Sequence, residues 1–141
     1  MRKLIVIAAL ALLVPSLALA GGKPTVPGTS QDSHGKAAPK VMYMLKGTLT
    51  AYTAANGTTN GTVSILVKSA NHHGATLKTQ TLTFPVSSGT KIVTENGSPV
   101  TVNDNGIVKL RGPKKLAPTD NLATVLQALT AFQVIDQGAA N

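Results

Sequence analysis

VMYMLKGTLTAYT, residues 41–53, decides the fold, because its apolar side chains recur at every second position. A period of two is the pattern of a β-strand with one buried face, since successive side chains of a strand point to opposite sides. Gly47 lies at the centre of the stretch, where a glycine is typical of a bulge or a sharp bend. We therefore expect a strand with a bulge or bend at Gly47, whose buried face holds Val41, Tyr43, Leu45, Leu49 and Ala51.

The same alternation continues in the two segments that follow. Residues 61–70, GTVSILVKSA, and residues 78–86, KTQTLTFPV, are rich in β-branched side chains and also repeat with a period of two. The composition stays of this kind almost to the C-terminus, which predicts one all-β domain over residues 40–137 and a tail over residues 138–141. The expected buried faces of these two strands hold Val63, Ile65 and Val67, and Leu82, Phe84 and Val86.

Asn-Gly pairs mark the expected turns. This dipeptide suits the type I′ hairpin turn, in which both central residues have positive φ. We expect a hairpin over residues 90–102 that is closed by Asn96 and Gly97, followed by a strand over residues 106–112. The four pairs lie at residues 56–57, 60–61, 96–97 and 105–106.

The segment 121–137, NLATVLQALTAFQVIDQ, is open between a helix and a strand. Its early Ala, Leu and Gln favour a helix with Asp120 as N-cap, whereas Phe132, Val134 and their neighbours favour a strand. We favour a long final strand, because a meander of strands has to be completed. A helix over residues 121–131 stays open as the alternative.

The first twenty residues, MRKLIVIAALALLVPSLALA, have the parts of a secretory signal peptide: a basic start, an apolar run and small residues at the end. We expect cleavage after Ala20 and a disordered leader over residues 21–39, whose Gly, Pro, Ser and Lys cannot bury a core. The chain has no cysteine, so a disulfide framework is excluded. The sequence therefore predicts a secreted or extracytoplasmic protein with no transmembrane segment in the mature chain.

Positive charge is the main surface property. The formal net charge of +8 falls to +6 when Arg2 and Lys3 leave with the signal peptide, and such an excess favours polyanionic surroundings. Four cations lie close together in GIVKLRGPKKL, residues 106–116. They are the predicted polyanion-binding residues: Lys109, Arg111, Lys114 and Lys115. The alternative is that they form the solvated face of an outer strand, where lysine also deters edge-to-edge pairing.

The adjacent histidines in SANHHGAT, residues 69–76, raise the question of a metal site. A zinc site needs three or four converging ligands. The chain has no cysteine and few carboxylates, and its third histidine, His34, lies in the leader. We predict no metal site and interpret His72 and His73, the weak candidates, as exposed members of a turn.

Catalytic residues are not indicated. The carboxylates of the domain are Glu95, Asp104, Asp120 and Asp136, and their spacing does not predict a pair held in one pocket. No nucleophile-elbow pattern and no phosphate-binding glycine loop occurs. We expect no enzyme activity and no cofactor.

The segments GTLTAY, TLTFPVSSGTKI, VKLRGPKKL and AFQVID, in this order, resemble small secreted bacterial proteins with an uncharacterised OB-like β-barrel domain. The resemblance covers residues 45–137 and consists of glycine, threonine and valine patterns. It implies a small antiparallel barrel of five to seven strands, an exported location and no catalytic residue to carry over.

These features predict an exported, non-catalytic β-barrel module with an interaction or cell-envelope role. One alternative is electrostatic binding of a cell-wall polymer or nucleic acid through the basic strand and loop. Specific nucleic-acid binding is not expected, because only 3% of the residues are aromatic and too few can stack on bases. An alternative of another class is a small hydrolase with an unrecognised site.

Overall fold

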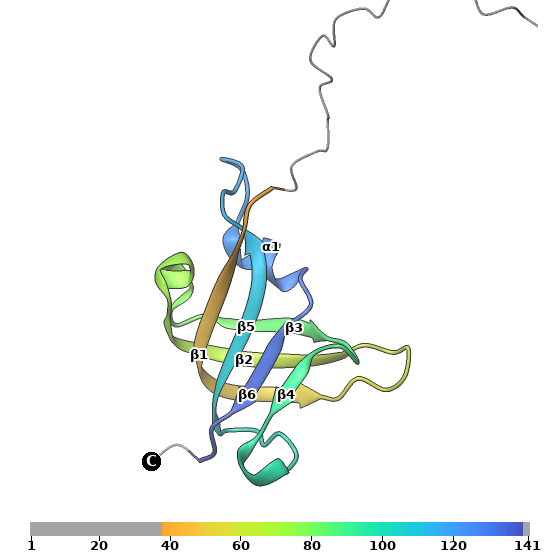
Figure 1. Ribbon diagram of the computed structural model, residues 1–141. Coiled ribbons are helices and arrows are strands. Elements are labelled where there is room, and N and C mark those ends of the chain that lie inside the picture. The colour runs from red at the N-terminus through yellow and green to blue at the C-terminus, as the bar shows by residue number, and fades with distance from the viewer. Residues whose placement is uncertain (1–37, 140–141) are drawn as a thin grey trace, which may run out of the picture. The chain divides into compact units, whose positions relative to one another are not determined.

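The computed structural model describes residues 38–139, in which six strands form one sheet (Figure 1). The strand order is β3-β2-β1-β5-β6-β4, and every neighbouring pair is antiparallel except β4 and β6. The all-β class is confirmed. The strands are β1 (Lys40–Thr53), β2 (Gly61–Ala70), β3 (Thr81–Val86), β4 (Lys91–Val93), β5 (Asn105–Pro113) and β6 (Gln133–Asp136). The helices are the short α1 (Leu122–Gln127) and the 3₁₀ turns η1 (His72–Leu77) and η2 (Glu95–Gly97).

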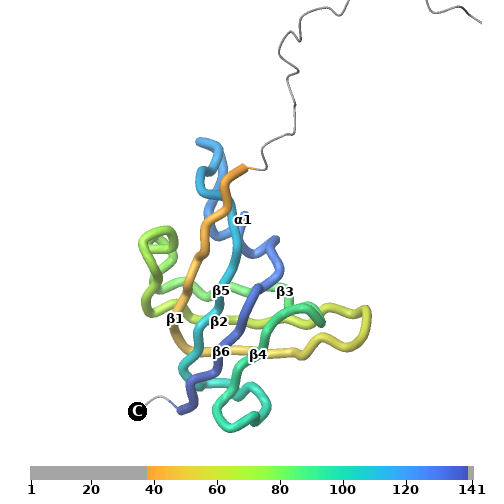
Figure 2. Tube along the Cα trace, viewed as in Figure 1, coloured from red at the N-terminus to blue at the C-terminus, as the bar shows by residue number. Residues whose placement is uncertain are grey.

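β1 belongs to both halves of the sheet. Its residues 40–48 pair with β5, and its residues 45–53 pair with β2. In Figure 1, β2 and β3 run across β5, β6 and β4, and Figure 2 shows the trace of β1 turning from one direction into the other. One strand therefore connects two layers whose inner faces share one core.

The turn in β1 lies at Gly47, as the sequence predicts. The register with β2 shifts between Lys46 and Gly47, because Lys46 pairs with Ser69 and Gly47 pairs with Val67, which leaves Lys68 without a partner. A Cβ atom on Gly47 would lie 1.8 Å from the carbonyl oxygen of Leu66. Only glycine permits this approach of two backbones.

Fifteen buried residues from five strands, η1, α1 and the segment before β6 form the core. The predicted inner faces of β2 and β3 are confirmed. In β1 a second register shift, between Leu49 and Ala51, changes the alternation. Ala51 is therefore exposed, contrary to expectation, and Tyr52 packs against the core in its place.

The sheet is not closed into a barrel, which corrects the expectation of an antiparallel barrel. Its two ends, β3 and β4, are consecutive in the chain and are separated only by residues 87–90. α1 and the segment that follows it occupy the outer edge of β3: Thr83 N donates to the side chain of Gln127, the last residue of α1 (3.2 Å), and Ala131 N donates to Pro85 O (2.8 Å). These bonds occupy groups that another strand would need.

The hairpin expected over residues 90–102 is wrong. Asn96 and Gly97 do have positive φ values of 56° and 71°, but they belong to η2, and no strand follows before β5. Pro99 lacks an N–H group, and Thr101 N donates to the Asp136 carboxylate (2.8 Å) in place of a ladder partner. β4 pairs with β6 in parallel instead.

The final segment is a helix followed by a short strand, so the expected long final strand is wrong. Asn121, rather than Asp120, is the N-cap of α1, and its side chain accepts a hydrogen bond from Thr124 N (3.2 Å). Leu126 anchors the helix in the core. β6 has only four residues. No helix within residues 38–139 is long and apolar enough to cross a membrane.

We predict that Gly47→Ala lowers the free energy of unfolding by more than about 3 kcal/mol, because the added methyl overlaps backbone that side-chain rotation cannot relieve. Gly89→Ala is the control, since the nearest atom to its added Cβ, Ser87 Oγ, lies 3.7 Å away. The control is expected to change stability by less than about 0.5 kcal/mol. Urea unfolding measures both, and equal effects would contradict the role assigned to Gly47.

Candidate functional site

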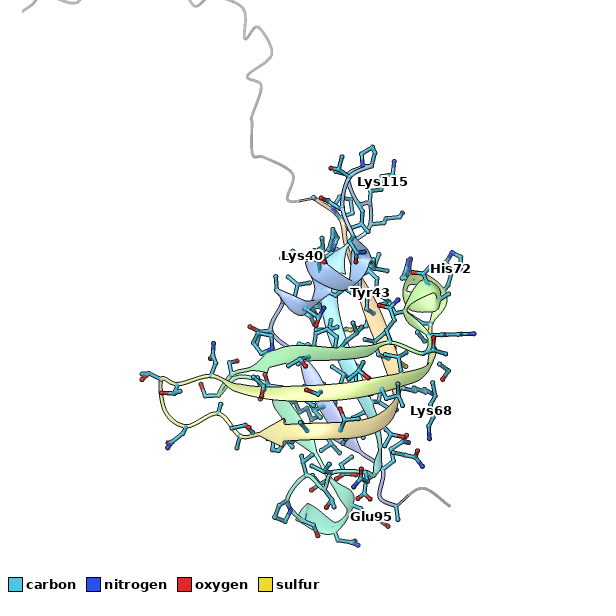
Figure 3. The ribbon with its side chains drawn as sticks, turned by 180° about the vertical axis from the view of Figure 1, so that it is seen from behind. Lys40, Tyr43, Lys68, His72, Glu95 and Lys115 are labelled. Carbon is cyan, nitrogen blue, oxygen red and sulfur yellow. The ribbon has the colours of Figure 1, made fainter. Side chains whose placement is uncertain are left out.

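The four predicted polyanion-binding residues separate into two pairs. Lys109 and Arg111 lie on β5 and alternate with the buried Val108 and Leu110, so they point away from the core. Lys114 and Lys115 are exposed in the loop after β5. Figure 3 shows Lys115 at the tip of this loop. The two pairs are therefore neighbours in sequence but belong to a strand face and to a loop.

Arg111 stacks on the ring of Phe132, which no sequence pattern connects with it. Its guanidinium carbon lies 4.2 Å from the centroid of the Phe132 ring. Phe132 is 41% exposed, and its backbone is fixed between two strands: its N–H donates to Lys109 O (2.8 Å), and its carbonyl accepts from Lys91 N (3.1 Å). Cation–π contact of this kind contributes about 0.5–1 kcal/mol at an exposed site, and it holds the guanidinium plane in place.

Further cations join Lys109 and Arg111 on the same side of the sheet. Lys109 pairs with Gln133 of β6, and Gln133 pairs with Lys91 of β4. Lys46 of β1 pairs with Ile107 of β5, the outward residue two positions before Lys109. We name Lys46, Lys91, Lys109 and Arg111 the outer basic face. No local sequence signal identifies Lys46 and Lys91 as its members, since only the strand register brings them there.

The described acidic residues lie elsewhere. Asp136 pairs with Gly106 and is buried on the inner side of β6. Asp120 lies in the loop before α1, where its carboxylate accepts from Ala117 N (3.0 Å). Glu95 and Asp104 lie near the C-terminal end of β6, at another pocket. By this register, the outward positions of β1, β5, β6 and β4 carry no acidic residue.

That other pocket, of about 220 Å³, gathers three carboxylates: Glu95, Asp104 and Asp136. Their spacing in the sequence did not predict this, because η2 and the β5–β6 pairing bring distant segments together. Figure 3 shows Glu95 at the end of the molecule opposite Lys115. Partial burial, the charges of Asp136 and Glu95, and a hydrogen bond to Asp136 raise the pKa of Asp104 above its usual 3.8.

Asp136 has a structural role in this pocket. Its carboxylate accepts from Thr101 N (2.8 Å) and from Gly138 N (3.0 Å), so both oxygens are engaged by backbone donors. Within residues 38–139, no group of three or more His, Cys, Asp or Glu side chains has the geometry to hold a metal ion.

We predict that Asp104→Asn raises the melting temperature at pH 7 and has little effect near pH 3. The folded state binds the Asp104 proton more tightly than the unfolded chain does, so stability is lost as the pH rises above about 3.8 through the folded-state pKa. Asparagine does not ionise, so the variant does not lose stability as the pH rises through this range. Melting curves at the two pH values test this, with Asp120→Asn as the charge-matched control, and a gain of equal size at both pH values would contradict it.

The two histidines of SANHHGAT lie in η1 and are exposed. Their ring centroids are 5.6 Å apart, and His73 also lies 6.0 Å from the ring of Tyr43. Figure 3 shows η1 with His72 pointing away from the sheet. His34 lies outside the described residues.

Asn71, rather than either histidine, connects this turn to the sheet. Its side chain donates to Met42 O (2.8 Å) and accepts from Met44 N (3.3 Å), while its own N–H donates to Met44 O (3.1 Å). These are β1 groups that β2 no longer reaches, because β2 ends at Ala70. The Asn71 amide thus continues the ladder beyond the end of the strand.

We predict that Asn71→Ala destabilises the domain by about 1–3 kcal/mol, since two part-buried hydrogen bonds to backbone are lost. His72→Ala, in the next position, is expected to change stability by less than about 0.5 kcal/mol. Thermal or urea unfolding compares the two variants. An equal loss in both would show that the turn as a whole, and not the Asn71 amide, carries the stability.

Comparison with protein-family models, with curated proteins and with solved structures gives no match to this chain. The resemblance to secreted proteins with an OB-like domain therefore stays a prediction.

Proposed function

We propose that the domain is an exported, non-catalytic binding module that holds anionic polymers on its outer basic face. The observation that carries the proposal is the strand register, which gathers Lys46, Lys91, Lys109 and Arg111 on outward positions free of acidic residues. Opposite charges nearby would cancel the field of such a group. Their absence from these positions supports attraction of polyanions.

The spacing of these cations suits a flexible polymer. Two residues along a strand are about 7 Å apart, and two strands across a sheet are about 10 Å apart, so Lys109 lies at about these spacings from Arg111 and Lys91. Successive anionic groups of a polymer can each contact a different one of these side chains, so several ionic contacts form along one chain. A cell-envelope polymer is the expected partner of an exported domain.

The chemistry of the outer basic face favours electrostatic binding that does not depend on the sequence of the bound polymer. Lysines act as point charges, and Arg111 offers a planar fork that its contact with Phe132 holds ready. One stacked ring does not form a platform for successive bases. Lys114 and Lys115 extend the positive field beyond the end of β5, so they are expected to contribute to long-range attraction more than to fixed contacts.

The hydrolase alternative would have to use the pocket of Glu95, Asp104 and Asp136. A raised pKa at Asp104 suits a general acid. However, the partner carboxylate of Asp136 is occupied by two backbone donors, which favours a structural role for the group.

Retention on immobilised heparin as the salt concentration rises tests the proposal. Lys109→Gln is expected to elute at lower salt than the wild type and to lower the salt slope by about one, since one ionic contact is lost. Lys78→Gln is the matched control, because it removes the same charge from an exposed residue between η1 and β3. Elution of both variants at the same salt concentration would contradict the proposal.

A further inference from the structure

A pocket of about 420 Å³ lies where β1 bends, and its lining is polar and basic. This volume falls in the range of small-molecule sites, about 300–1,000 Å³. Two lysines line it, and no acidic or aromatic residue does. The lining residues are Lys46, Gly47, Lys68, Ser69, Asn105, Gly106, Gln137 and Ala139.

The bulge in the β1–β2 pairing brings the two lysines together. Lys46 pairs with Ser69, so these two side chains lie on the same face. Lys68 is the additional residue of the bulge, and as a result Lys68 and Ser69 are both exposed, although they are adjacent in the strand. A regular strand would point them to opposite faces. Figure 3 shows Lys68 at the side where β1 curves into the layer of β2.

The opposite wall of the pocket is fixed by backbone hydrogen bonds. Gln137 N donates to Asn105 O (2.8 Å), and Asn105 N donates to Gly138 O (3.0 Å), which prolongs the β5–β6 pairing past the end of β6. The side-chain amides of Asn105 and Gln137 are thereby held at the rim. Alternation directs the neighbouring carboxylates of Asp104 and Asp136 into the acidic pocket, away from this one.

The lining favours a particular class of ligand. Two ammonium groups, one hydroxyl and two amides are donors that match the oxygens of a phosphate group, and two positive charges match its dianion. The lining has no ring to stack on a nucleobase and no large apolar side chain to cover an acyl chain. The remainder of the ligand should therefore be polar, as in a phosphorylated sugar or polyol.

We propose that this pocket binds the phosphate monoester of a small polyol or sugar, with Lys46 and Lys68 as the principal phosphate contacts. The site goes beyond the polymer-binding role and does not rest on it, although Lys46 belongs to both. A phosphate group could also reach the pocket as a diester unit of a polymer. A phosphodiester carries one negative charge per phosphate, so it matches the two lysines less well than the monoester dianion does.

Titration with glycerol 3-phosphate, followed by backbone amide NMR shifts, tests the proposal. Saturable shifts are expected at Gly47, Ser69 and Gly106, with weaker binding below pH 6 as the monoester takes up a proton. Glycerol should cause no shifts, and the diester glycero-3-phosphoglycerol should bind more weakly. Absence of shifts at these amides, or equal binding of monoester and diester, would overturn the assignment.

Two variants of equal charge separate this site from the outer basic face. Lys46→Gln/Lys68→Gln is expected to weaken glycerol 3-phosphate binding at least about tenfold. Lys109→Gln/Arg111→Gln should leave that binding unchanged while lowering retention on heparin. Equal weakening by both variants would mean that only the net charge matters, and would overturn the pocket. If Lys46→Gln/Lys68→Gln loses glycerol 3-phosphate binding while Lys109→Gln leaves retention on heparin unchanged, the phosphate pocket is supported and only the polymer-binding role is contradicted.

Discussion

The close contact between Gly47 and the Leu66 carbonyl is the constraint on which the rest of the structure depends. The missing side chain lets β1 bend and pass from one layer to the other without a break in the chain. Leu45 and Leu49, on either side of the bend, both lie fully buried between the layers. Gly106 pairs with Gly47 from β5 and also leaves no room for a side chain. A Cβ atom on Gly106 would lie 2.5 Å from the side chain of Leu49. A bend in one strand thus replaces a loop between two sheets.

Polar side chains complete the sheet where its strands end. The Asn71 amide continues the pairing of β1 beyond β2, and the Asp136 carboxylate takes up backbone donors from residues on both sides of it. Thr90 does the same in the turn between β3 and β4, where its hydroxyl donates to Ala131 O (2.7 Å) and accepts from Ser87 N (3.0 Å). These side chains therefore satisfy individual backbone groups at the irregular ends of the sheet.

Patterns local in sequence predicted the parts of the fold that depend on local geometry. The alternation around Ile65 and Phe84 identified buried faces correctly, and Gly47 was recognised as a bend, because side-chain direction and glycine conformation are properties of one segment. The hairpin at Asn96 failed because the true partner of β4 is β6, about forty residues later in the chain. Likewise, the cap at Asn121 decided a helix that composition alone left open.

The candidate sites also contain some residues that local sequence identifies and others that only long-range pairing brings together. Lys109 and Arg111 were recognisable from their strand, whereas Lys46, Lys91 and Phe132 join them only through register between distant segments. The same holds for the three carboxylates and for the meeting of Lys46 and Lys68 at one pocket, which depends on the additional residue of a bulge. Charge and turn chemistry can be read locally, but which groups meet is decided by long-range pairing.

The double pairing of β1 has a consequence while the chain is being synthesised. Its second edge has no partner until residues 105–113 become available, whereas β2 and β3 follow it closely in the chain. During that interval a row of unsatisfied N–H and C=O groups is open to another molecule, and the β5 segment of a second copy could occupy it in a swapped dimer. Lys40 and Lys46 lie along this edge, and mutual repulsion of their charges makes self-association of the half-formed sheet less favourable.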